Sequence, residues 1–107
     1  MIDVRNTTEL LSEGKIPKSK NVPLPFIVRG DFELNSNVFK TIYGFPKPMF
    51  TDEIVVVCKT GKRALRAAEL LARLGYMNLK VYLGGIEDWR KNGGKLIMEG
   101  KIRHYLI

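Results

Sequence analysis

The sequence predicts an α/β domain built on a mainly parallel sheet, and three segments carry that prediction. The run EIVVV at Glu53–Val57 does not alternate, which is typical of a central parallel strand buried on both faces. Lys62–Leu74 repeats its apolar and polar residues with the period of an amphipathic helix. Lys80–Leu83 is then predicted to be a second buried strand. The chain has 107 residues, without repeats or an internal linker, and this length indicates one domain.

The half of the chain before Glu53 holds shorter elements. Residues 2–5 resemble the end of a strand, and Asn6–Gly14 predicts a helix that Asn6 or Thr7 caps. Prolines then forbid a continuous helix and indicate an extended crossing segment. These prolines are Pro17, Pro23 and Pro25. The remaining elements are a short helical or turn segment at 28–34, a helix at 36–43 and a loop at 44–52.

The half that begins at Glu53 ends in a short helix and a tail. In the helix Lys62–Leu74, a polar stripe is predicted on one side, formed by Lys62, Arg66, Glu69 and Arg73. The opposite, buried side is predicted to be Leu65, Ala68, Leu71 and Ala72. Gly84-Gly85 ends the second strand, and Ile86–Lys91 predicts a short helix that carries Trp89. Residues 95–107 form a basic tail with only weak alternation, and its His104 is not assigned a function.

The formal net charge of +7 is unevenly distributed. Residues 1–57 hold seven basic and seven acidic residues, whereas residues 58–107 hold eleven basic and four acidic residues, which leaves the whole +7 there. Such a field favours an anionic partner, and the alternative is an ordinary solvated basic surface. Because no aromatic residues interleave with the basic ones, nucleic acid is not the expected partner.

Cysteine content and hydropathy exclude several classes of protein. One cysteine and one histidine leave no internal disulfide and no ordinary cysteine/histidine zinc site. No apolar run approaches the roughly 18 residues of a membrane span, and no signal peptide is visible. A lone cysteine fits a reducing compartment. We therefore expect a cytoplasmic protein without a membrane segment, with a mitochondrial location as the alternative.

The lone cysteine, Cys58, directly follows the predicted central strand and opens the loop CKTGKR. A strand, a glycine-containing loop and a helix together form an anion cradle, because successive backbone N–H groups and the helix N-terminus face one point. Ligands of open α/β sheets bind at this edge. Helix N-termini and nearby cations also favour the nucleophilic thiolate of a cysteine. Cys58 is therefore the candidate nucleophile, and the alternative is a small buried apolar residue.

The spacing in this loop distinguishes between kinds of cradle. A Walker loop needs a glycine at Val56 and a Ser or Thr at Arg63, so that motif fails. A tyrosine-phosphatase-like Cys-x5-Arg loop would need arginine at Ala64. Here the arginine comes one residue earlier, which leaves less room for a tetrahedral phosphoryl group and disfavours phosphatase chemistry.

The loop CKTGKR resembles the CxxGxR active-site loop of single-domain rhodaneses, the thiosulfate sulfurtransferases. IDVR with GKIPKSKNVPL is similar to the family's Asp-Val-Arg and G-x-I-P-x-x-x-N-x-P segments. LGYMNLKVYLGGIEDW is similar to its Gly-Tyr-x-Asn-Val and Leu-x-Gly-Gly-x-x-x-Trp signature. The resemblance implies a rhodanese-like, three-layer domain over residues 1–94, with a central sheet flanked by helices, followed by the tail at 95–107.

By this resemblance, Cys58 carries a sulfane sulfur as a persulfide, taken from thiosulfate or a related small anionic donor. The resemblance also implies substrate-binding residues in the loop, namely Lys59, Thr60, Gly61, Lys62 and Arg63. Asp3 and Arg5 would support the site, Asp3 by pairing with Arg63 and Arg5 by pairing with Glu9. Trp89 and Gly84-Gly85 match a packing signature. No metal and no cofactor are implied.

The acceptor of the sulfur must come from outside, because no second cysteine is present. Cyanide would serve in the test tube, and glutathione, thioredoxin or another protein thiol in a cell. We expect a monomer. The chain departs from the family pattern because only Met1 and Ile2 precede Asp3, where the family has a further strand and helix. The alternative function is therefore a weakly active or inactive rhodanese-fold domain used for interaction or regulation.

Overall fold

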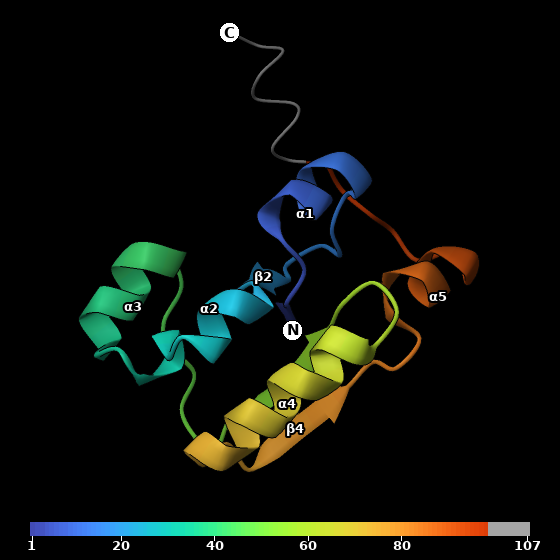
Figure 1. Cartoon of the computed structure of the whole chain (residues 1–107). Helices are drawn as coiled ribbons and strands as arrows, with labels where there is room; N and C mark the ends of the chain where they lie inside the picture. The colour runs from blue at the N-terminus through green and yellow to red at the C-terminus, as the bar shows by residue number, and fades with distance from the viewer. Residues whose placement is uncertain (99–107) are drawn as a thin grey trace, which may run out of the picture.

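The computed structural model describes residues 1–98, in which short strands alternate with helices (Figure 1). The strands are β1 (Ile2–Asp3), β2 (Lys20–Asn21), β3 (Glu53–Val57) and β4 (Asn78–Val81). The helices are α1 (Thr7–Glu13), α2 (Leu24–Val28), the 3-10 helix η1 (Asp31–Glu33), α3 (Ser36–Tyr43), α4 (Lys62–Leu74) and α5 (Gly85–Lys91).

The strands form one parallel sheet in the order β2-β1-β3-β4 within the described residues. β1 pairs with β3 so that Ile2 lies opposite Val56 and Asp3 opposite Val57. Because all pairs are parallel, the carboxyl ends of the strands meet at one edge of the sheet. The predicted α/β class with a mainly parallel sheet is confirmed.

Apolar side chains cover both faces of this sheet, which gives the three layers. Val56 points into the larger core, to which α2, α3 and α4 contribute. The buried residues of that core from these helices are Ile27, Phe39, Ala64, Ala67 and Leu71. Val57, the next residue of β3, points to the other face and packs with Ile16 and Ile86. The predicted three-layer arrangement is therefore confirmed.

The bounds of β3, α3 and α4 agree with the predicted ones, but the predicted buried side of α4 is partly wrong. Leu65 is 46% exposed and Ala72 is also exposed, whereas Ala64, Ala67 and Leu71 are fully buried. The two buried alanines have small side chains, so the helix backbone lies close to the sheet and to α2.

The predicted β4 and the predicted crossing segment also need correction. β4 covers Asn78–Val81 rather than Lys80–Leu83, and it is half-buried because only β3 lies beside it. The extended segment ends earlier than predicted, since α2 begins at Leu24 and holds Pro25 in its first turn. A proline fits there because the first N–H groups of a helix have no intrahelical partner. Of the tail, Ile97 bridges Lys15, and residues 99–107, with His104, lie outside the described residues.

No helix within residues 1–98 has the length and apolar character needed to cross a membrane.

The aromatic cluster around α3 should dominate the stability of the larger core. Phe39 is fully buried, and its ring centroid lies 5.2 Å from that of Phe32, 4.7 Å from that of Tyr43 and 5.3 Å from that of Phe45. We expect Phe39→Ala to lower the free energy of unfolding by about 3–5 kcal/mol, because it removes the ring and leaves a cavity. Urea denaturation measures this change.

The matched control is Val38→Ala, one residue earlier in the same helix, where the side chain is 40% exposed. This substitution should cost less than about 1 kcal/mol. Equal losses in the two variants would contradict the placement of Phe39 in the core.

Candidate active site

Cys58 lies where β3 ends, and its side chain is only 1% exposed. The Cys58 carbonyl accepts a hydrogen bond of 2.9 Å from the backbone N–H of Ile86, and the Lys59 carbonyl accepts one of 3.3 Å from that of Glu87. Both donors belong to α5. The start of the loop is therefore held against that helix as well as against the sheet.

Two backbone N–H groups point at the sulfur of Cys58. Gly61 N–H donates to Cys58 Sγ at 3.0 Å, and Ala64 N–H donates to it at 3.4 Å. Gly61 immediately precedes α4 and Ala64 lies in its first turn, so the sulfur faces the N-terminus of that helix. Donors in this position, together with the helix dipole, stabilise negative charge on the sulfur.

Two glycines make this close packing possible. Gly61 has φ +102°, and a Cβ there would lie 2.4 Å from the carbonyl oxygen of Leu83. Gly85 has φ +67°, and a Cβ there would lie 2.2 Å from the carbonyl oxygen of Lys59. Any side chain at either position would push the loop away from the segment that leads into α5. The structure thus gives Gly85 a packing role at the loop.

Helix α1 contacts the loop through two ion pairs. Arg63 binds Glu9 with both terminal nitrogens of its guanidinium group, at 2.5 Å for Nη1–Oε1 and 3.0 Å for Nη2–Oε2. Lys59 Nζ lies 3.4 Å from Glu13 Oε1. The predicted pairing of Arg63 with Asp3 is wrong, because both terminal nitrogens of Arg63 bind Glu9.

Asp3 pairs instead with Arg5, and both side chains are fully buried. Arg5 Nη2 donates to Asp3 Oδ2 at 2.8 Å and to the carbonyl oxygen of Gly14 at 2.9 Å. The predicted pairing of Arg5 with Glu9 is therefore also wrong. The buried pair ties β1 to the residue that ends α1, and so it fixes the position of α1 beside the loop.

The pairing of Glu9 with Arg63 changes the pKa of both groups. The hydrogen bonds from Arg63 hold the pKa of the Glu9 carboxyl at about 2, below its ordinary value of 4.5, although partial burial acts in the opposite direction. The same hydrogen bonds raise the pKa of Arg63 above its ordinary value. Both charges therefore persist throughout the physiological pH range.

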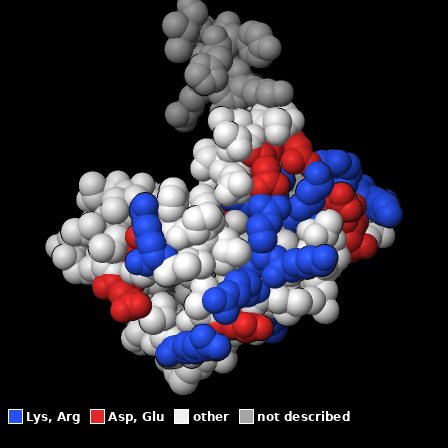
Figure 2. All heavy atoms as spheres, viewed as in Figure 1, with Lys and Arg blue, Asp and Glu red and all other residues white. Residues whose placement is uncertain are grey.

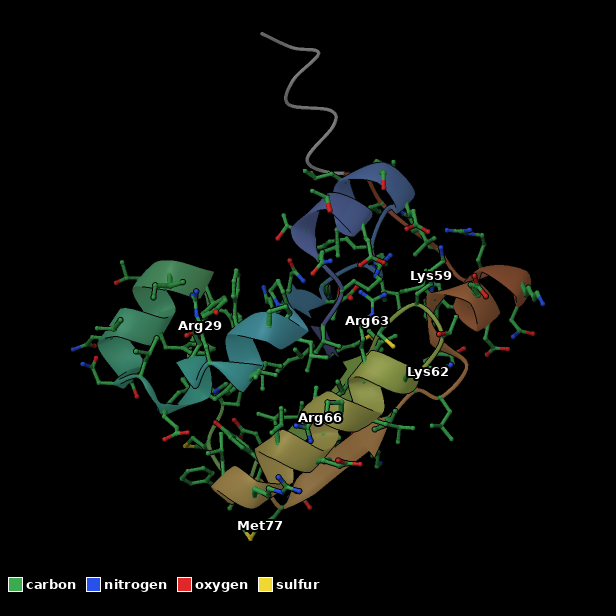
Figure 3. The ribbon with its side chains drawn as sticks, viewed as in Figure 1. Arg29, Lys59, Lys62, Arg63, Arg66 and Met77 are labelled. Atoms are coloured by element: carbon green, nitrogen blue, oxygen red, sulfur yellow. The ribbon has the colours of Figure 1, made fainter. Side chains whose placement is uncertain are left out.

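The remaining predicted site residues lie on the solvent side of the loop. Thr60 is exposed, and Lys62 is an exposed residue that begins α4. Figure 2 shows that basic side chains gather over this face of the molecule, with a few acidic ones between them. Figure 3 shows Lys59 and Arg63 on the α1 side of the loop, and Lys62 and Arg66 on the α4 side. The structure thus brings the five predicted loop residues, Lys59 to Arg63, around Cys58.

Sequence reasoning missed Glu13 and gave Glu9 the wrong partner. A signal existed, because Glu9 and Glu13 are four residues apart and so are Lys59 and Arg63. Residues four apart lie on one face of a helix, so the carboxylates of α1 match the spacing of the two loop cations. No group of three or more His, Cys, Asp or Glu residues in the described part of the chain could hold a metal ion.

This arrangement of a strand, a loop and a helix around a single thiol lies within a segment, residues 1–92, that matches the rhodanese-like domain. The chain belongs to the rhodanese family. Among solved structures, the human single-domain sulfurtransferase TSTD1 superimposes on this chain with a TM-score of 0.79 at 32% sequence identity. That match covers 84% of this chain and 79% of the human one.

Three curated rhodanese relatives carry names that describe sulfur transfer. The mouse thiosulfate sulfurtransferase/rhodanese-like domain-containing protein 3 is 38% identical and covers 83% of this chain. Two relatives come from Saccharomyces cerevisiae and each cover 88% of this chain. They are the mitochondrial thiosulfate sulfurtransferase RDL2, 33% identical, and a thiosulfate:glutathione sulfurtransferase, 36% identical. The chain spans only 56%, 62% and 66% of the lengths of these three relatives, respectively.

The Glu9–Arg63 pair should make the free energy of unfolding depend on pH in the acidic range. Because its folded pKa of about 2 lies below 4.5, Glu9 stabilises the fold fully above about pH 4.5 and loses this contribution as the pH falls toward 2. We expect Glu9→Gln to be less stable than the unsubstituted protein by about 1 kcal/mol at pH 7, as for a partly exposed pair. The difference should shrink below pH 4.5, and urea denaturation across this pH range measures it.

Glu33→Gln is the control, since Glu33 is exposed and has no ion pair within residues 1–98. Its effect should be small and should not follow the pH dependence of Glu9→Gln. A pH-independent difference for Glu9→Gln would contradict the ion pair.

The contact of Gly85 with the loop can be tested against a second glycine of similar conformation. Gly85→Ala should be destabilised by left-handed strain of about 1–2 kcal/mol and by overpacking of about 1–3 kcal/mol. Gly93 has φ +79°, but a Cβ added there would meet no atom within 4 Å, so Gly93→Ala should show only the strain. Equal urea midpoints for the two variants would show that Gly85 does not contact the loop closely.

Proposed function

We propose that this rhodanese is a sulfurtransferase that carries a sulfane sulfur on Cys58, from thiosulfate or a related anionic donor to a thiol acceptor. The observation that carries the proposal is the convergence of the Gly61 and Ala64 N–H groups on Cys58 Sγ. The names of the relatives support the donor and the reaction type. Asp3 and Arg5 would support the site by holding α1 in place.

In the first step, the Cys58 thiolate attacks the outer sulfur of thiosulfate. A bond forms between the two sulfurs, the sulfur–sulfur bond of thiosulfate breaks, and its electron pair leaves with sulfite. The products are the Cys58 persulfide anion and the sulfite dianion, so atoms and charge balance. The N–H groups of the loop, from Lys59 to Arg63, stabilise the negative charge that develops on the sulfurs.

In the second step, a thiolate acceptor attacks the outer sulfur of the persulfide. The acceptor leaves as a persulfide, and Cys58 returns to the thiolate. The chain has one cysteine, so the acceptor comes from outside. Glutathione is the acceptor we favour, because one relative is named a thiosulfate:glutathione sulfurtransferase, and a thioredoxin-like protein thiol is the alternative. Neither step uses a metal or a cofactor.

The expected location is the cytoplasm or the mitochondrion. A lone thiol that must cycle through a thiolate fits a reducing compartment. The mitochondrial alternative is supported by the name of the yeast relative RDL2. We expect the protein to act as a monomer.

The intact mass of the protein after incubation with thiosulfate tests the proposal. We expect the mass to increase by one sulfur atom, to return to its starting value on addition of glutathione, and to stay unchanged in Cys58→Ser. Thiocyanate formation from thiosulfate and cyanide should be lost in the same variant. A folded protein that takes up no sulfur would favour the alternative, an inactive rhodanese domain used for interaction.

A further inference from the structure

We infer that Glu13 determines which loop cation receives anionic substrates, because it neutralises Lys59 and leaves Lys62 for that role. The inference rests on the proposed function for the identity of the anions. It assigns Glu13 as a specificity-determining residue, although Glu13 itself lies in α1 and not in the loop.

Four cations lie at or next to the loop, and α1 supplies counter-ions to two of them. Glu9 pairs with Arg63 and Glu13 pairs with Lys59. These two carboxylates lie one helical turn apart, so α1 presents both to the loop from the same side. The positive charge left without a carboxylate from α1 is therefore on the α4 side, at Lys62 and Arg66 (Figure 3).

The two ion pairs differ in strength. Arg63 and Glu9 make two hydrogen bonds, and their side chains are 33% and 22% exposed. Lys59 and Glu13 make a single contact of 3.4 Å, and their side chains are 41% and 26% exposed. A single contact at 3.4 Å is weaker than the two hydrogen bonds between Arg63 and Glu9, so an arriving anion can compete with Glu13 for Lys59. Glu13 thus acts as an internal competitor at one side of the loop.

Lys62 has no such competitor. It is exposed, it begins α4 where the helix dipole is positive, and no ion pair to it exists within residues 1–98. Arg66 lies one turn later and is 51% exposed, and its one ion pair within the described residues is a long contact of 3.7 Å to Glu69. A dianion such as thiosulfate should therefore approach Cys58 from the α4 side, with Lys62 as its direct contact.

Steady-state kinetics with thiosulfate and cyanide test this assignment through a pair of double variants. We expect Glu13→Gln to raise kcat/KM for thiosulfate about threefold, mainly through KM, and the gain to fade as salt screens it. Lys59→Met should lower kcat/KM about threefold and Lys62→Met about tenfold. The difference arises because Lys62 contacts the anion, whereas Lys59 mainly balances Glu13.

The decisive comparison is rescue. Glu13→Gln should restore kcat/KM of Lys59→Met to within about twofold of that of the unsubstituted protein, because this double variant removes a neutral pair. Combined with Lys62→Met, the same substitution should leave kcat/KM at least about threefold below that of the unsubstituted protein. Arg73→Met is the matched control: it removes one exposed cation from the same helix, in its last turn, and should change kcat/KM less than about 1.5-fold. Return of Lys62→Met to the level of the unsubstituted protein on addition of Glu13→Gln, no rescue of Lys59→Met, or no effect of Glu13→Gln alone would overturn the inference.

A second readout separates this inference from the proposed function. The single cysteine allows the alkylation rate of Cys58 to be measured with iodoacetate, an anion, and with iodoacetamide, a neutral reagent of similar size. Their ratio reports the attraction of anions to the sulfur and needs no sulfur transfer. Glu13→Gln should raise this ratio and Lys62→Met should lower it, with the same pattern of rescue. If the ratios follow this pattern without sulfur uptake, only the proposed function fails; unchanged ratios overturn the inference.

Discussion

The pairing of β1 with β3 is the constraint on which the site depends. Asp3 lies opposite Val57, and the backbone N–H of Val4 donates to the Val57 carbonyl at 2.9 Å. The residues that follow these strands, Arg5 on one and Cys58 on the other, therefore leave the sheet at the same edge. A shift of one residue would turn every side chain of the short β1 to the opposite face. It would also move α1 away from the loop, because α1 begins four residues after β1 ends.

The buried pair of Asp3 and Arg5 fixes the position of α1 relative to the paired strands β1 and β3. Burying two charges costs free energy, and the hydrogen bonds between them offset that cost only when the geometry is good. Here Arg5 also donates to the Gly14 carbonyl, so the pair holds the C-terminal end of α1 directly. With α1 in this position, Glu9 pairs with Arg63 and Glu13 pairs with Lys59. The fully buried pair is thus structural, and the two partly exposed pairs adjust the charge around the sulfur.

Local sequence patterns predicted the helices and strands of this fold better than they predicted which strands are neighbours and which charged residues pair. The run EIVVV marks β3 from end to end, and Gly75 marks the end of α4, because each signal lies within the element itself. The strand order is not a local property, so β4 was predicted to be a buried strand although it lies at an edge of the sheet and is partly exposed. The charge partners failed for the same reason: Asp3 and Glu9 are both within reach of Arg5 and Arg63 in principle, and only the register of β1 and β3 assigns them. The loop residues lie together because they are consecutive in the sequence, whereas Glu13 comes from another element.

The partner of Arg63 bears on the kind of anion the loop serves. In a phosphate cradle, an arginine at the end of the loop would turn inward and bind the phosphoryl oxygens with both of its terminal nitrogens. Here both terminal nitrogens of Arg63 bind Glu9, outside the loop. The backbone N–H groups of Gly61 and Ala64 point at the Cys58 sulfur itself. Under the proposed function, the backbone N–H groups would stabilise charge on the sulfur, and the side-chain cations would act at the entrance of the loop.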